Sequence, residues 1–251
     1  RYSSSAASDV YKRQDLMRDA IEKMGAPADL VIAIEIPSLE TTNELMQQCD
    51  RVLATGGGAM VTAAYSSGTP ALGVGVGNAV ITVDDTADLD DAATKIHMSK
   101  TLDLAASCSS DNSVILVDSI YEPMLERLKA KGGYLCNAEE KEKLRNTIWD
   151  DEGHLNTAIV AQHAQKIASM AGLDIPETTE FYIVIEEGWG KDFPFSGEKL
   201  SVVMALYRAS NIDHAIELTN NIQSYQGQGH SCGIYSNSCL LYTSPSPRDC
   251  Q

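Results

Sequence analysis

Residues 51–74, RVLATGGGAMVTAAYSSGTPALGV, carry the pattern that decides the fold of this chain. Residues 51–54 predict a short strand, and the glycine-rich turn after them opens a helix over residues 59–65. A Ser-Ser-Gly sequence closes that helix, and residues 71–74 predict a second strand. Strands and helices that alternate through short connections are typical of a parallel sheet covered by helices. We therefore predict an α/β fold.

The residues before this stretch continue the alternation towards the N-terminus. Apolar side chains at helical spacing predict a helix over residues 15–24, which a glycine and a proline end. A β-branched run predicts a strand over residues 30–36. Residues 38–48 follow as a helix in which Ser38 is the expected N-cap.

Both ends of the chain resemble translated sequencing adapters. Residues 4–14, SSAASDVYKRQ, and residues 239–249, CLLYTSPSPRD, correspond to two matching adapters read in one frame. We therefore expect residues 1–14 and 239–251 to be adapter-derived, and the insert between them to be an internal fragment of a gene. Natural Ser-rich tails are the weaker alternative, because both ends match.

The composition excludes several classes of protein. The 251 residues include 19 Lys and Arg against 35 Asp and Glu, a net charge of −16, whereas nucleic-acid binding requires a basic surface. No apolar stretch approaches the roughly 18 residues that span a bilayer. The cysteines lack the spacing of a zinc site or a disulfide framework, so we expect no metal and reduced thiols in the cytoplasm. An acidic cluster over residues 84–91 could suggest a cation site, but the start of a helix at Asp88 explains it better.

Cys108 lies in a stretch of small, mostly polar residues before the apolar run of residues 114–117. A structural cysteine usually sits inside an apolar run, whereas a nucleophile needs a loop whose backbone can donate hydrogen bonds. An unassisted thiol is only a few per cent thiolate at neutral pH, and no His or Lys is adjacent in sequence. We predict that Cys108 is the nucleophile of an enzyme and that the fold activates it.

Two glycine clusters precede Cys108. The first, in residues 55–58, opens a helix after a strand, where backbone N–H groups can bind phosphate and glycine lets the anion approach. The second occupies residues 73–77. Neither is the GxGxxG fingerprint, and a tight turn would explain each of them as well.

Taken together, these motifs resemble the aldehyde dehydrogenase superfamily, most closely its CoA-acylating branch. The resemblance is carried by ATGGGAMVTAAYSSGTPALGVGVGNA, SKTLDLAASCSSDNSVILVD, PFSGEKLS and GQGHSCGI, which begin at residues 54, 99, 194 and 227. It implies that residues 15–75 are the later half of a Rossmann-like nicotinamide-cofactor domain. Residues 76–238 would then be most of the α/β catalytic domain, incomplete at its C-terminus.

The resemblance also implies a chemistry. Cys108 would attack an aldehyde, NAD or NADP would take the hydride, and coenzyme A would accept the acyl group from the thioacyl-enzyme. His230 would act at the catalytic centre by contacting CoA or the thioester, although a structural role is the alternative. The positions implied for the cofactor are Thr55, Gly56, Gly57, Gly73 and Glu198. A surface pair with Lys199 is the alternative for Glu198.

The release step separates the branches of this superfamily. Hydrolytic members carry a Glu in an ELGG-type strand end, whereas Ala71-Leu72-Gly73-Val74 has no carboxylate there. Without a base for water, transfer to a thiol is favoured. A carboxylate elsewhere, a phosphate-dependent semialdehyde reductase and a non-catalytic nucleotide-binding fragment remain alternatives.

The loop around Cys108 also bears on the substrate. LAASCSSDNS looks more like the acylating sulfoacetaldehyde dehydrogenases than the acetaldehyde or propionaldehyde enzymes. The polar side chains that would suit an anionic head group are Ser107, Ser109, Ser110 and Asn112. Members of the superfamily are commonly homo-oligomers, and some are packaged in bacterial microcompartments. We expect a fragment that lacks half of its cofactor domain to be inactive by itself.

Overall fold

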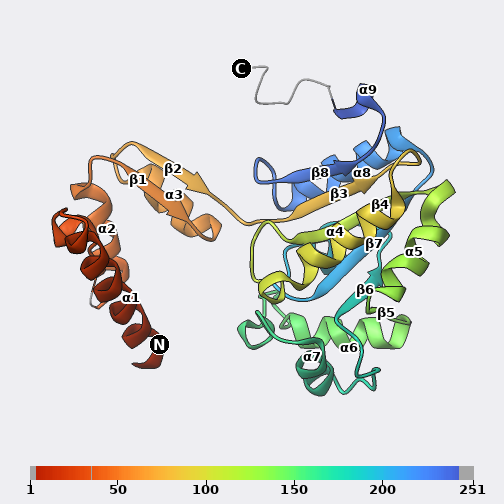
Figure 1. The fold of residues 1–251 in the computed structure, drawn as a ribbon, viewed down its shortest axis with the longest axis horizontal. Coiled ribbons are helices and arrows are strands. Elements are labelled where there is room, and N and C mark those ends of the chain that lie inside the picture. Colours follow the sequence, from red (N-terminus) through yellow and green to blue (C-terminus); the bar gives the residue numbers. More distant parts are fainter. Residues whose placement is uncertain (1–3, 35, 243–251) are drawn as a thin grey trace. The chain divides into compact units, whose positions relative to one another are not determined.

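The computed structural model describes residues 4–34 and 36–242 (Figure 1). These residues form two compact units, which divide between Gly73 and Val74. The first unit contains α1 (Ser4–Lys23), α2 (Leu39–Gln48), β1 (Val52–Thr55), α3 (Gly58–Ser66) and β2 (Ala71–Val74). Strands β1 and β2 pair in a two-stranded sheet, and α3 lies between them in the sequence. The predicted strand, helix and strand of residues 51–74 are therefore confirmed.

The start of α2 follows from a single side chain. The Ser38 hydroxyl accepts a hydrogen bond from the Thr41 N–H at 3.0 Å, as expected for an N-cap. The strand predicted over residues 30–36 is wrong, since residues 31–34 and 36 join no sheet and residues 28–30 form a short 3-10 turn. A β-branched run becomes a strand only when a neighbouring strand takes its backbone groups. Here the Arg18 Nε donates to the Val31 carbonyl instead.

The second unit is built on six strands. They are β3 (Ala79–Val83), β4 (Asp111–Val117), β5 (Gly133–Leu135), β6 (Phe181–Ile185), β7 (Val203–Ala209) and β8 (Cys232–Tyr235). Every pair of neighbours is parallel, in the order β5-β6-β7-β4-β3-β8. The helices are α4 (Leu89–Thr101), α5 (Tyr121–Ala130), α6 (Ala138–Ile148), α7 (Ala164–Ala171), α8 (Ile212–Tyr225) and α9 (Cys239–Tyr242).

The connections of this sheet run in two directions. From β4 the chain passes through α5 to the β5 edge, and from β7 it passes through α8 to the β8 edge. Because parallel crossovers are right-handed, α5 and α8 cover opposite faces of the sheet. Strands β4 and β7 are neighbours at the point where the direction changes.

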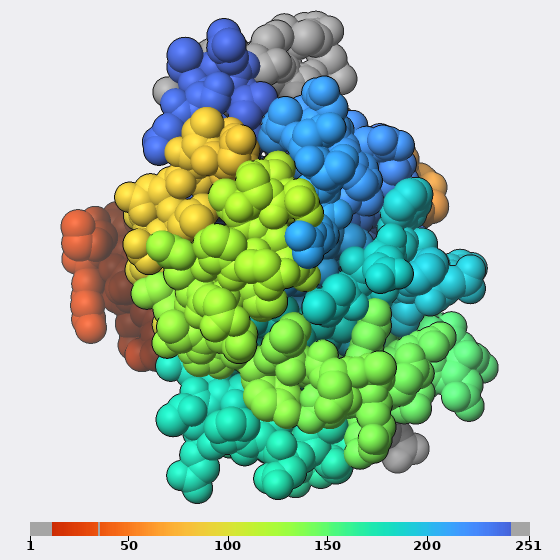
Figure 2. All heavy atoms as spheres, turned by 90° about the vertical axis from the view of Figure 1, so that its right-hand side faces the viewer, coloured from red at the N-terminus to blue at the C-terminus, as the bar shows by residue number. Residues whose placement is uncertain are grey.

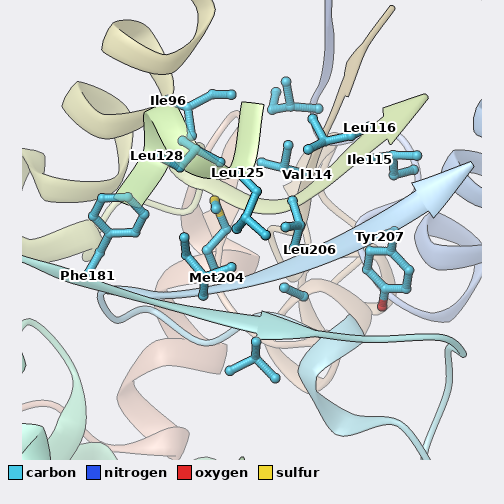
Figure 3. Close-up of a cluster of buried hydrophobic side chains, with 14 of the residues drawn as sticks. Ile96, Val114, Ile115, Leu116, Leu125, Leu128, Phe181, Met204, Leu206 and Tyr207 are labelled. Carbon is cyan, nitrogen blue, oxygen red and sulfur yellow. The ribbon is translucent and has the colours of Figure 1, made fainter. Parts of the chain in front are cut away.

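The core of the second unit lies between the sheet and its helices. Figure 3 shows apolar side chains from α4, α5, β4, β6 and β7 in contact, and Val114, Ile115 and Leu116 of β4 are completely buried. Strands that are covered on both faces are continuous apolar runs rather than alternating ones. The run of residues 114–117 has this character, which explains why it forms a central strand.

The acidic cluster before α4 serves the helix. Asp88 is its N-cap, and the carboxylate accepts hydrogen bonds from the Asp90 and Asp91 N–H groups, both at 3.1 Å. The helix-start interpretation is confirmed. Within the described part of the chain, no three His, Cys, Asp or Glu side chains are grouped so as to hold a metal ion. None of the helices described there has the length and apolar character needed to cross a membrane.

Candidate active site

The candidate catalytic residues of the second unit lie at the amino ends of its strands. Gly77, Cys108, Glu198 and His230 precede β3, β4, β7 and β8, respectively. These four strands are consecutive in the order β7-β4-β3-β8, and all of them are parallel. Their amino ends therefore lie side by side at one end of the sheet, which brings together residues as far apart in the sequence as 77 and 230.

Cys108 and His230 form a hydrogen-bonded pair. The Cys108 Sγ lies 3.2 Å from the His230 Nε2, and the His230 Nδ1 lies 2.9 Å from the Ser231 Oγ. Both side chains are half-buried. A nucleophile within reach of a base whose second nitrogen is held by a third group is the arrangement that activates serine and cysteine nucleophiles. His230 can therefore take the thiol proton and stabilise the thiolate.

Gly77 lies between Cys108 and Glu198. A Cβ atom at residue 77 would stand 2.5 Å from the Cys108 carbonyl oxygen, 2.6 Å from the Cys108 Cβ and 2.9 Å from the Glu198 Oε1. Only glycine fits this position without moving one of its neighbours. The Glu198 carboxyl is thus held within a few ångströms of the Cys108 backbone, which the sequence separation of the two residues did not indicate.

The environment of Glu198 favours its neutral form. Burial raises the pKa of this carboxyl from 4.5 to about 6, although a hydrogen bond from the Gly77 N–H and the charge of Lys199 act in the opposite direction. A carboxyl with this pKa changes its charge close to neutral pH, where proton transfer is efficient. Glu198 is therefore both a possible hydrogen-bond acceptor for hydroxyl groups and a possible base.

Lys199 does not form a surface pair with Glu198. Its side chain is completely buried, and its Nζ donates to the Phe195 carbonyl at 2.6 Å and to the Gly197 carbonyl at 3.0 Å. Burial holds the pKa of this amine well below its usual range. Lys199 closes the turn that leads into Glu198, so the surface-pair alternative for these two residues is wrong.

The backbone just before Cys108 is strained. Asp103, Leu104 and Ala105 have φ values of +48°, +54° and +57°, three consecutive residues other than glycine in the left-handed region. Such conformations cost about 1–2 kcal/mol per residue and persist only where the surroundings enforce them. The sequence gives little sign of this turn, because Asp103 is the one residue of residues 101–107 whose type tolerates the left-handed region.

The polar residues near Cys108 differ in their freedom to bind a substrate. Ser107 and Ser109 are exposed, and their hydroxyls lie 2.9 Å apart. Asn112 is buried, and its amide nitrogen donates to the Asn78 side chain and to the Gly197 carbonyl. Asn112 therefore has no free donor for an anionic head group, contrary to the prediction for this residue.

The glycine positions predicted for the cofactor lie in the first unit. Thr55 ends β1, Gly56 follows it, and Gly57 is the N-cap of α3, which no side chain caps. A Cβ atom at Gly57 would meet nothing within 4 Å, so the backbone is open to an approaching anion. Gly73 differs, because a Cβ atom there would stand 2.5 Å from the Val61 side chain. Close packing of α3 on β2 accounts for this glycine.

A cavity of about 910 Å³ lies at the opposite end of the sheet, where the strands have their carboxyl ends. It is lined by residues at or just after the carboxyl ends of β4, β6 and β7, among them Asp118, Glu186 and Arg208, and by residues of α5 and α8. Figure 2 views the molecule from this end of the sheet, with α5 in yellow-green beside α8 in blue. None of the predicted site residues lines the cavity, so the thiol site and the cavity occupy different ends of the strands.

Comparison with known proteins identifies the family of this chain. A sequence profile described as the aldehyde dehydrogenase family matches residues 10–171. The chain belongs to the aldehyde dehydrogenase family. It is 46% identical, over 217 residues, to the acylating sulfoacetaldehyde dehydrogenase of Cupriavidus necator. That match covers 85% of this chain and 44% of the relative.

Two solved structures of this family have the same fold. The acetylating aldehyde dehydrogenase of Geobacillus thermoglucosidasius superposes with a TM-score of 0.91 at 38% identity, covering 97% of this chain and 55% of that protein. The propionaldehyde dehydrogenase of Rhodopseudomonas palustris, solved with bound propionyl-CoA, superposes with a TM-score of 0.82 at 27% identity, covering 91% and 50%. This chain therefore spans about half the length of the aldehyde dehydrogenases that it matches.

Proposed function

We propose that the protein from which this sequence comes oxidises a small aldehyde to its acyl-CoA, with Cys108 as the nucleophile. The observation that carries the proposal is the 3.2 Å contact between the Cys108 Sγ and the His230 Nε2. Similarity to an acylating sulfoacetaldehyde dehydrogenase and to a propionaldehyde dehydrogenase solved with propionyl-CoA supports the choice of coenzyme A as the acyl acceptor.

The first half of the proposed reaction forms an acyl group on Cys108. His230 takes the thiol proton, and the thiolate attacks the aldehyde carbon to give a thiohemiacetal, whose oxygen carries the developing negative charge. A bound nicotinamide cofactor, NAD or NADP, would supply the hydride acceptor for this carbon. The product is a thioester between the substrate and the Cys108 sulfur.

Residues in each unit suit parts of this nicotinamide cofactor. In the first unit, Thr55, Gly56 and the open, uncapped N-terminus of α3 at Gly57 provide backbone donors for a phosphate. In the second unit, the half-buried Glu198 carboxylate can accept hydrogen bonds from ribose hydroxyls. The packing of Gly73 against Val61 supports a structural rather than a binding role for that glycine.

The second half of the reaction passes the acyl group to coenzyme A. The CoA thiolate attacks the thioester carbonyl, the bond to the Cys108 sulfur breaks, and the cysteine is regenerated. After the first half-reaction His230 must release the Cys108 proton to solvent. It can then take the proton of the incoming CoA thiol and return it to the Cys108 sulfur, which lies within hydrogen-bond distance.

Hydrolysis is the second candidate, and one observation favours it. Glu198 lies beside Gly77 and the Cys108 backbone, and burial raises its pKa to about 6, so it could act as a base towards water. The absence of a carboxylate from Ala71 to Val74 in β2 favours CoA transfer instead. The two candidates differ in whether the acyl group on Cys108 leaves in the absence of coenzyme A.

Acylation of Cys108 by an acyl-CoA tests the proposal without the nicotinamide cofactor. The acyl group passes from the CoA sulfur to Cys108 and releases the CoA thiol, so mass spectrometry of the Cys108 peptide measures the reverse of the second half-reaction. The exposed Cys232 is an internal control for thiol reactivity. We expect faster acylation at Cys108 than at Cys232, and a loss of this difference in His230→Ala. Equal labelling of both thiols would contradict the proposal.

The same assay addresses the substrate, which we propose to be sulfoacetaldehyde. The exposed Ser107 and Ser109 hydroxyls can donate to a sulfonate, and the relative from Cupriavidus necator is named for this substrate. Sulfoacetyl-CoA should acylate Cys108 faster than acetyl-CoA or propionyl-CoA. Faster reaction of the unsubstituted thioesters would refute the choice of substrate and leave the acylating chemistry in place.

A further inference from the structure

A set of buried side-chain amides ties together the four segments that carry the candidate active site. Asn78 follows Gly77, Asn112 lies four residues after Cys108, and Gln226 lies four residues before His230. Asn78 and Asn112 are 0% and 4% exposed, and Gln226 is half-buried. We call these three side chains the amide network.

Asn78 is the centre of the amide network. Its Nδ2 donates to the Ser196 carbonyl at 2.7 Å and to the Gln226 carbonyl at 3.0 Å. Its Oδ1 accepts from the Asn112 Nδ2. Both hydrogens and the oxygen of this amide are thus in use, which is the condition under which a buried amide specifies a single geometry rather than destabilising the interior.

The other two amides extend these bonds to Glu198. The Asn112 Nδ2 also donates to the Gly197 carbonyl at 2.7 Å, and the Gln226 Oε1 accepts from the Glu198 N–H at 2.8 Å. The segment before β7 is thereby held from two sides, by β4 through Asn112 and by the end of α8 through Gln226. The two bonds to residues 197 and 198 hold a segment that precedes β7 and is in no strand.

We infer that Asn78 is a positioning residue, which fixes Cys108, Glu198 and His230 relative to one another through the amide network. The inference deepens the proposed function and rests on it, because it assigns a purpose to the geometry of the Cys108–His230 pair. Asn78 has no recorded contact with the reacting groups. It acts through the segments that carry them, since its amide joins those of Gly77, Glu198 and His230 directly and that of Cys108 through Asn112.

The rate at which Cys108 reacts with iodoacetamide tests the inference in the full chain of 251 residues. An unassisted thiol is about 3% thiolate at pH 7, so a correctly placed base can raise the rate by up to about 30-fold. At pH 9.5 an unassisted thiol is already about 90% thiolate, and the base adds little. The ratio of the two rates therefore reports the placement of His230, whereas a change in access to the thiol alters both rates together.

The main variant is Asn78→Asp, which keeps the shape of the side chain and removes both donors. Because the new carboxylate also adds a negative charge that disfavours the thiolate, the uncharged Gln226→Leu is measured beside it and must give the same change in the rate ratio. The matched control is Thr82→Val, which lies in β3 four residues after Asn78 and removes the 3.2 Å contact between the hydroxyls of Thr82 and Thr219 away from the site. Cys49, in the first unit, serves as the internal reference thiol. Melting curves of both variants establish that the rates are measured on folded protein.

We expect Asn78→Asp to lower the Cys108 rate at pH 7 by 10-fold or more, with less than a 3-fold change at pH 9.5 and no change in Thr82→Val. If Asn78→Asp fails to fold, Gln226→Leu at its half-buried position carries the same test and the same expectation. A wild-type rate ratio in the folded variant would overturn the inference, whatever His230→Ala does. A wild-type ratio in His230→Ala, by contrast, would refute the Cys108–His230 pair and with it the proposed function.

Discussion

Replacement of Gly77 by alanine tests how closely Cys108 and Glu198 are held. The new Cβ would stand 2.5 Å from the Cys108 carbonyl oxygen, whereas ordinary van der Waals contact begins at 3.4 Å. The Cys108 backbone or the segment of residue 77 must therefore move by about 0.9 Å, since a carbonyl oxygen cannot rotate away as a flexible side chain can. A displacement of this size costs about 100-fold in reactions that depend on a fixed geometry.

The assay combines thermal unfolding with acylation of Cys108 by an acyl-CoA. Overpacking at Gly77 should lower the free energy of unfolding by about 1–3 kcal/mol. For a domain of this size, that corresponds to a fall in Tm of roughly 2–12 °C. Acylation of Cys108 should slow by 10-fold or more, because the thiol no longer meets His230 at 3.2 Å.

Gly75→Ala is the matched control, since a Cβ atom at residue 75 meets nothing within 4 Å. It changes the same type of residue two positions away and should leave both measurements unchanged. If Gly77→Ala behaves like Gly75→Ala in Tm and in acylation, then residues 77, 108 and 198 are not packed as described, and the argument for a preformed site fails.

Three further changes are expected to act as follows. The raised pKa of Glu198 means that the folded state keeps this proton up to about pH 6, while the unfolded state releases it near pH 4.5. The free energy of unfolding should therefore fall by about 1 kcal/mol as the pH rises from 4.5 to 6. Glu198→Gln should remove that part of the slope in denaturant titrations, and an unchanged slope would contradict the burial of this carboxyl. Ala161→Gly should raise the free energy of unfolding by about 0.5–1 kcal/mol, because Ala161 has a φ of +54°; a lower stability would show that the turn is unstrained. Asn137→Ala should lower it by about 1 kcal/mol by removing the capping box with Glu140, and equal Tm values would argue against the cap.

Local signals predicted the parts of the fold that depend on neighbouring residues. The strand and helix of residues 51–66, the cap at Ser38 and the helix start at Asp88 each follow from side chains within a few positions of one another. The run of residues 30–36 shows the limit of this reasoning. Its β-branched side chains favour an extended backbone, but a strand also needs a partner, and the partner is not a local property.

In the candidate site, too, the features that depend on neighbouring residues could be predicted and those that depend on distant residues could not. Cys108 could be predicted as a nucleophile from its polar loop and from a family resemblance, because both signals lie in consecutive residues. The contacts that give the site its geometry could not be predicted, since Gly77, Glu198 and the amide network meet only after four strands have paired. Asn112 illustrates the difference: its polarity suggested a substrate contact, and its bonds are internal instead.

The order in which the strands enter the sheet sets the time at which the thiol acquires its base. His230 follows Cys108 by 122 residues and lies just before β8, which comes last in the sequence among the described strands and pairs with β3. At a synthesis rate of about 5–20 residues per second, Cys108 is made roughly 6–24 s before His230. Throughout that interval the nascent chain presents an ordinary, slowly reacting cysteine. If His230 activates Cys108 as we propose, the activated thiol therefore arises only after β8 has paired with β3.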